Sequence, residues 1–124
     1  MPDKTKSHST NKKREDKLLL EDILKSIELM EEYIQNVSRK EFMSSNMYLD
    51  LVIRRLEVIG EAVSNLSREL QEKYSDIPWQ EISGMRNKLI HEYFGVDRDL
   101  VWETATKDIP VFKKNVQELL KEYN

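Results

Sequence analysis

Apolar residues recur at spacings of three and four along most of the chain, which is the pattern of helices that bury one face. The first series spans residues 20–37, and a second, longer series spans residues 47–70. Ser44, Ser45 or Asn46 is available to cap the second helix, which the pattern predicts to be the longest. The break around residues 38–42 is short, and short connections favour antiparallel neighbouring helices.

A third helix is predicted where Pro78 stands in a position that a first helical turn accepts, with the acidic Glu81 in the same turn. Its apolar positions continue to Tyr93 and Phe94. Gly95 follows directly, and glycine is a natural stop for a helix. The sequence therefore predicts a third helix that ends just before residue 95.

The last apolar series runs from residue 100 to residue 123, with Asp97 or Asp99 as the expected cap. Pro110 falls inside this series. Because proline lacks a backbone N–H and clashes with the preceding turn, we expect a kink near residues 107–109.

These patterns predict an all-α fold, an antiparallel four-helix bundle with a kinked last helix. A chain of 124 residues with 39% hydrophobic residues is long enough for one core but not for two. Three glycines and three prolines also favour continuous helices over a turn-rich sheet fold. We therefore expect one helical domain over residues 16–124.

Residues 1–15 show no apolar periodicity, and the sequence predicts a disordered basic tail there. Residues 1–14 hold five basic residues and one acidic residue, a charge of +4, which leaves −7 on the remainder of a chain whose total is −3. Such an acidic body does not attract nucleic acid, so any RNA contact needs a local basic surface or a second protein. The tail is expected to be solvated, and the alternative is a basic arm that contacts RNA phosphates.

The composition excludes several kinds of chemistry. The chain has no cysteine, which rules out disulfides, thiolate metal sites and a cysteine nucleophile. No stretch approaches the roughly 20 apolar residues that span a bilayer, and the start of the chain lacks the apolar run of a secretory signal. The sequence contains no cluster of carboxylates that would suggest a metal site. We therefore expect a cytoplasmic protein without membrane contact and without a cofactor.

The polar residues of the third helix do not fit a plain amphipathic pattern. At about 100° per residue, Arg86 and Tyr93 lie within roughly 20° of each other on the apolar side. A guanidinium there needs a partner, because an unpaired buried charge is costly. The simplest interpretation is a structural ion pair with Asp50, Glu57 or Glu61 on the second helix. The alternative is a ligand or a cleft between subunits.

Asn87 and His91 lie four residues apart on the other side of this helix, where the amide is able to orient the imidazole. Arg86 and His91 are about 140° apart on an ideal helix. Spacing alone therefore does not bring them together. Their convergence requires the long reach of the arginine, a distorted helix end, or two copies that face each other in a dimer. Taken singly, His91 is an exposed helix-end residue and Tyr93 a packing residue.

The string formed by Arg86, four residues, His91, one residue and Tyr93 resembles the motif of HepT-like proteins in the HEPN superfamily. Asn87 follows the arginine, as a polar residue often does in that family. The similarity covers about residues 17–123 and includes Ile77-Pro78-Trp79, Tyr93-Phe94, Val96-Asp97 and Gly60-Glu61-Ala62.

The resemblance implies a metal-independent endoribonuclease toxin whose composite site forms when two protomers pair as a homodimer. His91 would act as general base or acid for attack of a ribose 2′-hydroxyl on the adjacent phosphate, and an imidazole pKa near 6.5 suits that task. Arg86 would stabilise the growing charge, Asn87 would orient the imidazole or the substrate, and Tyr93 would contact the RNA, either tRNA or mRNA.

The same resemblance implies a partner, a cognate MNT-type nucleotidyltransferase antitoxin that attaches AMP to the hydroxyl of Tyr93. A different class of function is also compatible with the sequence. In that alternative the chain is a non-catalytic helical binding subunit that docks a nucleotidyltransferase or a nucleotide.

Overall fold

The computed structural model describes the backbone of residues 4–92 and 97–123, and the side chains of residues 11–85, 87–88 and 97–123. This part of the chain contains helices and short connections but no strand, so the predicted all-α class is confirmed. In chain order the elements are α1 (Lys4–Ile34), α2 (Arg39–Met43), α3 (Asn46–Ser64), α4 (Arg68–Lys73), α5 (Trp79–Glu92), α6 (Arg98–Glu103), the π-helical turn η2 (Thr104–Asp108) and α7 (Ile109–Lys121).

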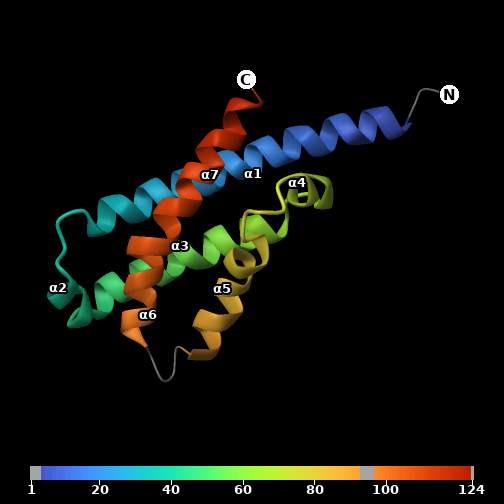
Figure 1. The fold of residues 1–124 in the computed structure, drawn as a ribbon. Helices are drawn as coiled ribbons and strands as arrows, with labels where there is room; N and C mark the ends of the chain where they lie inside the picture. Colours follow the sequence, from blue (N-terminus) through green and yellow to red (C-terminus); the bar gives the residue numbers. More distant parts are fainter. Residues whose placement is uncertain (1–3, 93–96, 124) are drawn as a thin grey trace.

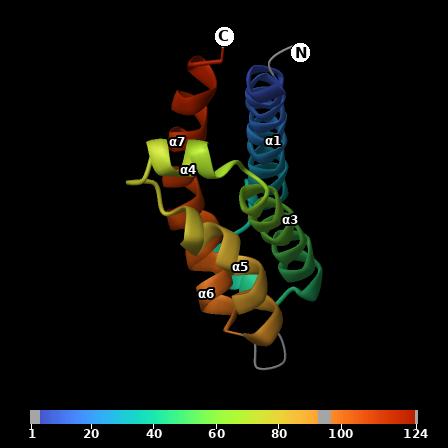
Figure 2. The same ribbon diagram turned by 90° about the vertical axis from the view of Figure 1, so that its right-hand side faces the viewer.

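The long helices form a bundle, as Figures 1 and 2 show. α1 and α3 pack side by side and run in opposite directions, and α5 packs on α3. The rod made by α6, η2 and α7 returns along the bundle and contacts α1. The two chain termini therefore lie at one end of the bundle, and the carboxyl end of α5 lies at the other.

One continuous apolar core fills the bundle, and every long helix contributes to it. The predicted three-and-four spacing is seen in the buried side chains. Those that are less than 2% exposed are Leu20, Ile23, Ile27, Met30, Phe42, Val52, Leu56, Ile59, Val63, Ile109, Phe112 and Val116.

The described helix α1 begins at Lys4 and spans 31 residues, so it includes most of the segment 1–15 for which the sequence predicted a disordered tail. The tail boundary at residue 15 stays a prediction. No proline or glycine interrupts residues 4–34, and a helix that packing has already nucleated extends at low cost. α1, and not the helix over residues 47–70, is therefore the longest element.

The predicted helix over residues 47–70 is two helices. α3 ends at Ser64, and Ser67 starts α4 by accepting a hydrogen bond from the N–H of Leu70 at 3.2 Å. Leu66 and Leu70 are buried on both sides of this cap, so the apolar series continues through the break. At the other end of α3, Ser45 is the cap, one of the three predicted candidates.

The connection between α1 and α3 is more ordered than predicted, because it contains the short helix α2. Ser38 and Glu41 form a reciprocal capping box, in which each side chain bonds the other residue's backbone N–H. Phe42 is fully buried, with its ring 5.0 Å from that of Trp102. Phe42 therefore anchors α2 to the core.

The last helix begins and breaks where the sequence predicted. Asp97 caps α6 by accepting from the N–H of Leu100. The break is a π turn over residues 104–108, in which the N–H of Ile109 reaches the carbonyl of Thr104. Pro110 follows at once, and the wide turn accommodates a residue with no N–H to donate. The stop predicted at Gly95 lies outside the described residues.

Candidate functional site

Helix α5 carries three of the predicted site residues, Arg86, Asn87 and His91, and its first turns are held by aromatic packing. Trp79 is 4% exposed, and its indole N–H donates to the carbonyl of Tyr74 at 3.0 Å. Its ring meets that of Phe112 edge-on, with 5.9 Å between centroids. Ile82 and Met85 are buried on the following turns. These contacts fix the direction in which α5 runs toward residue 92.

The chain beyond α5 is anchored where it starts α6. The guanidinium of Arg98 donates to the carbonyl of Ser45 and to the side-chain oxygen of Asn46, at the start of α3. Arg39 of α2 pairs with Asp99. The start of α6 is therefore fastened to α2 and α3, at the end of the bundle opposite the termini.

The structure places Arg86, Asn87 and His91 on α5, as predicted. Asn87 is exposed. The side chains of Arg86 and His91, and all of Tyr93, lie outside the described residues. The convergence of the guanidinium and the imidazole therefore stays a prediction.

The simple alternative for Arg86, an ion pair on the second helix, stays a prediction too. Glu57 is half-buried on α3. Asp50 and Glu61 are more exposed, and each of them interacts with another residue.

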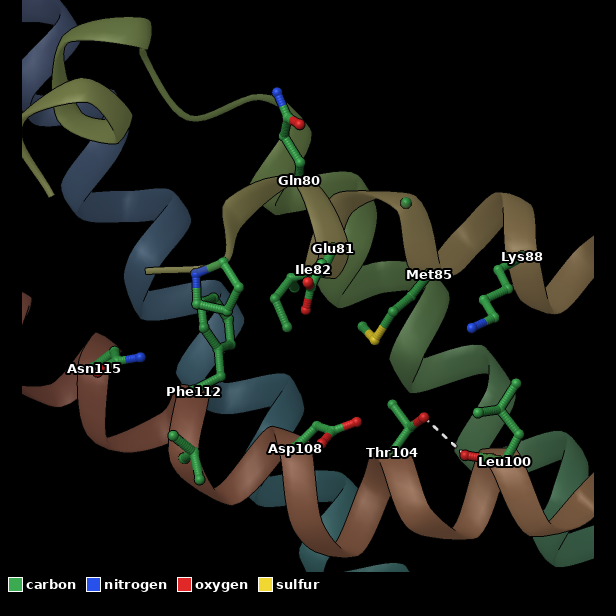
Figure 3. A pocket seen from close by; sticks show the side chains of 13 residues that line it. Gln80, Glu81, Ile82, Met85, Lys88, Leu100, Thr104, Asp108, Phe112 and Asn115 are labelled. Carbon is green, nitrogen blue, oxygen red and sulfur yellow. Dashed lines mark hydrogen bonds between the residues drawn. The ribbon is translucent and has the colours of Figure 1, made fainter. Parts of the chain in front are cut away.

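A cleft of about 710 Å³ runs between α5 and the rod of α6, η2 and α7. Figure 3 shows Met85 and Lys88 on the α5 side and Thr104 and Asp108 on the opposite side. Gly84 is part of the α5 wall, and a Cβ added there would meet nothing within 4 Å. A volume of this size is typical of a cleft that admits a small molecule or a nucleotide.

The cleft has an apolar floor and carboxylates along its walls. Ile82 and Phe112 are 4% and 1% exposed, whereas Glu81 and Asp108 are exposed. Two carboxylates disfavour a phosphate deep in the cleft, because like charges repel. An anion would therefore bind at the edge, beside Lys88.

Sequence reasoning gave no role to Lys88, although it directly follows Asn87. Its side chain is exposed and lines the cleft at the end nearer the carboxyl end of α5. The sequence did contain a signal for a lysine at the cleft, because Gly84 and Lys88 are four residues apart and share one helix face. An ammonium group here is suited to hold a phosphate next to the motif.

The described residues hold neither a membrane-spanning helix nor a metal-binding cluster. Their helices include none with the length and apolar character needed to cross a membrane. Their side chains include no group of three or more histidines, cysteines or carboxylates placed to hold a metal ion.

Comparison with known proteins places these features in a family. A family model described as Ribonuclease HepT-like matches residues 23–119, which include Arg86, His91 and Tyr93. A protein of Thermococcus cleftensis named "Probable ribonuclease HepT" is 42% identical over 109 residues, 88% of this chain and 99% of that protein. A candidate RNase of Caldanaerobacter subterraneus is 47% identical over 102 residues, 82% of this chain and 91% of that protein.

One relative is much longer than the region it shares with this chain. It is a gamma-glutamylcyclotransferase and candidate RNase of Methanocaldococcus jannaschii, 48% identical over 106 residues. The match covers 86% of this chain but 48% of that protein, so the chain spans about half its length. No solved structure matches the chain.

Proposed function

The chain belongs to the HepT-like ribonuclease family, and from this premise we propose that it is a metal-independent endoribonuclease that acts as the toxin of a toxin–antitoxin pair. The observation that carries the proposal is the sequence string of Arg86, His91 and Tyr93, the first two of them on α5, inside a family match that covers most of the chain. These residue types are sufficient for RNA cleavage by a ribose 2′-hydroxyl.

In the proposed reaction the 2′-oxygen attacks the adjacent phosphorus, and the bond to the 5′-oxygen of the next nucleotide breaks. His91 removes the 2′-proton or donates one to the leaving oxygen. Arg86 stabilises the negative charge that grows on the phosphate, and Asn87 orients the imidazole or the substrate. Tyr93 contacts the RNA, and Lys88 adds a phosphate contact at the edge of the cleft.

The composite site is proposed to form in a homodimer. On one ideal helix Arg86 and His91 are separated by about 140° and by about 7.5 Å along the axis. Two α5 helices that approach from different protomers remove this separation, because the arginine of one lies beside the histidine of the other. The exposed face of α5 at Gly84, Asn87 and Lys88 leaves room for such an approach.

Cleavage tests the proposal directly. Purified protein is incubated with total tRNA and with mRNA in EDTA, beside His91→Ala, Arg86→Ala and an Arg54→Ala control on the exposed face of α3. We expect cleavage by wild type and by the control, and a loss of at least about a hundredfold in the two site variants.

Equal inactivity of all four proteins, with mass spectrometry showing Tyr93 unmodified, would favour the alternative. The chain would then be a non-catalytic subunit that docks a nucleotidyltransferase or a nucleotide.

The proposed antitoxin is a nucleotidyltransferase that modifies Tyr93. The phenol oxygen of Tyr93 attacks the α-phosphorus of ATP, and pyrophosphate leaves. The phenolic proton is lost, so that AMP is joined to the tyrosine. The bulky, charged adduct would block the site. Co-expression with a neighbouring nucleotidyltransferase should add the mass of AMP to wild type and not to Tyr93→Phe, and an unchanged mass in both would remove this part of the proposal.

A further inference from the structure

A second concave surface lies at the opposite end of the bundle from the carboxyl end of α5, between α1, α4 and the residues that follow α7. It is a cavity of about 220 Å³. Its walls include Lys12 and Lys13 of α1, Lys73 of α4, and the tyrosines Tyr74 and Tyr123. We call these five residues the lysine recess. The elements that form it are far apart in the sequence, so it is a product of the fold.

The inward face of α1 becomes basic as it leaves the core. Asp16 is 4% exposed and marks the inward direction of this part of the helix. At about 100° per residue, Lys12 and Lys13 lie within about 40° and 60° of Asp16, on the same side of α1. Among the described residues, no ion pair engages Lys12 or Lys13. Their charges are therefore available to a ligand.

Three carboxylates share the wall with the lysines, and two of them accept hydrogen bonds within it. Asp16 accepts from the backbone N–H of Ser67 at 2.9 Å and from its hydroxyl at 2.5 Å. Glu122 accepts from the hydroxyl of Tyr74 and lies 4.0 Å from the ammonium of Lys73. Glu69 is the remaining carboxylate in the wall. The wall therefore holds three lysines and three carboxylates, and the excess of positive charge at this end lies on Lys12, Lys13 and the turns of α1 that lead away from the recess.

Aromatic rings accompany the lysines. The ammonium of Lys73 lies 5.4 Å from the ring centroid of Tyr74. Burial, followed by the carboxylates of Asp16 and Glu122, raises the pKa of Tyr123, so its hydroxyl is a neutral donor over the whole physiological range. Lysines interleaved with aromatic rings suit the phosphates and bases of a nucleic-acid strand.

α1 is basic in the turns that lead away from the recess. Figures 1 and 2 show that the first turns of α1 project past α4. Residues 1–14 carry a net charge of +4, against −7 on the remainder. A polyanion that avoids the acidic body would therefore be drawn to this end of the molecule.

We propose that the lysine recess binds the phosphate backbone of the RNA on which this ribonuclease acts, at a position remote from the cleavage site. This inference rests on the proposed function. From Lys12 to the end of α1 at Ile34 the helix spans about 33 Å at 1.5 Å per residue. The carboxyl end of α5 lies toward that far end. The recess therefore favours long RNAs, on the order of ten nucleotides or more at about 3.4 Å per phosphate.

Binding measurements separate this proposal from the proposal of cleavage. Each protein carries His91→Ala, so that the RNA stays intact, and is titrated against a labelled RNA of about 40 nucleotides at several salt concentrations. The recess variant is Lys12→Gln with Lys13→Gln. The matched control is Lys25→Gln with Lys114→Gln, which removes the same charge from exposed positions on α1 and α7.

We expect the recess variant to bind about tenfold more weakly near 0.1 M salt, and its salt slope to fall by about 1.4 because two phosphate contacts are lost. The control should change by less than about twofold. Equal affinity and slope in the two variants would overturn the proposal. So would a recess variant that changes only self-association, since the surface would then contact protein and not RNA.

The two proposals fail separately. If wild type cleaves RNA but the recess variant and the control variant bind RNA equally well, the ribonuclease proposal stands and the proposal for the lysine recess is wrong. If the protein binds long RNA through Lys12 and Lys13 but wild type does not cleave it, the proposal for the recess stands and the ribonuclease proposal is wrong.

Discussion

At the scale of single residues, one buried carboxylate links the first helix to the helix before the site. Asp16 of α1 accepts two hydrogen bonds from Ser67, whose own hydroxyl oxygen accepts from the N–H of Leu70 and so starts α4. The carbonyl of Tyr74, at the end of α4, then receives the indole N–H of Trp79. The placement of α5 thus depends in part on a side chain more than 60 residues earlier.

Asp16→Ala should lower the free energy of unfolding by about 2–3 kcal/mol, because it leaves two donors without their charged acceptor. Asp22→Ala, an exposed position on the same helix, should change it by no more than about 0.5 kcal/mol. Urea unfolding of both variants provides the measurement. Similar midpoints would mean that Asp16 does not hold α4.

The sequence offered no sign of this contact. Asp16 stands four residues before Leu20 and continues its helix face, but a polar residue there looks like the start of a tail. Its partner is 51 residues away, and spacing along a chain carries no information about such distances. The site residues on α5 differ, because Arg86, Asn87 and His91 lie on one short segment whose motif is visible in the sequence.

At the scale of elements, apolar spacing predicted where helices lie better than where they end. The series through Leu66 and Leu70 concealed the break between α3 and α4, since both leucines stay buried across it. The cap residue Ser67 was the local signal of that break. Pro110 correctly predicted a break in the last helix, because its missing N–H is a local property of the residue; the π-helical form of that break was not predicted.

The short helix α2 depends on one aromatic side chain. Phe42→Ala should cost about 3–5 kcal/mol, since Phe42 is fully buried against Trp102 and a cavity would remain. Met47→Ala is the matched control, because Met47 is also a large apolar residue near the start of α3 but is 61% exposed. Thermal unfolding should show a much lower midpoint for Phe42→Ala alone. Equal midpoints would contradict the anchoring role of α2.

At the scale of the whole molecule, the bundle brings together surfaces that the sequence separates. The walls of the cleft include Glu81 of α5 and Asp108 of η2, and the lysine recess is formed by α1, α4 and Tyr123. Periodicity predicts that four helices pack, but it does not fix which exposed faces meet. The motif was therefore predictable and its surroundings were not.

A site shared between protomers makes a prediction about mixtures. Arg86→Ala and His91→Ala should each be inactive, but a refolded equal mixture should recover about a quarter of wild-type cleavage, because half the dimers are mixed and each has one intact pair. Sedimentation before and after mixing would establish that subunits exchange. A mixed dimer that stays inactive would place both groups of each site on one chain.

The position of the two chain ends has a practical consequence for anyone who handles this protein. A purification tag at the carboxyl terminus would sit beside Tyr123, and one at the amino terminus would extend from the projecting end of α1; both lie far from the end of α5. Such fusions should therefore cut small oligonucleotides normally while misreporting affinity for long transcripts. Assays with extended substrates should use protein from which the tag has been removed.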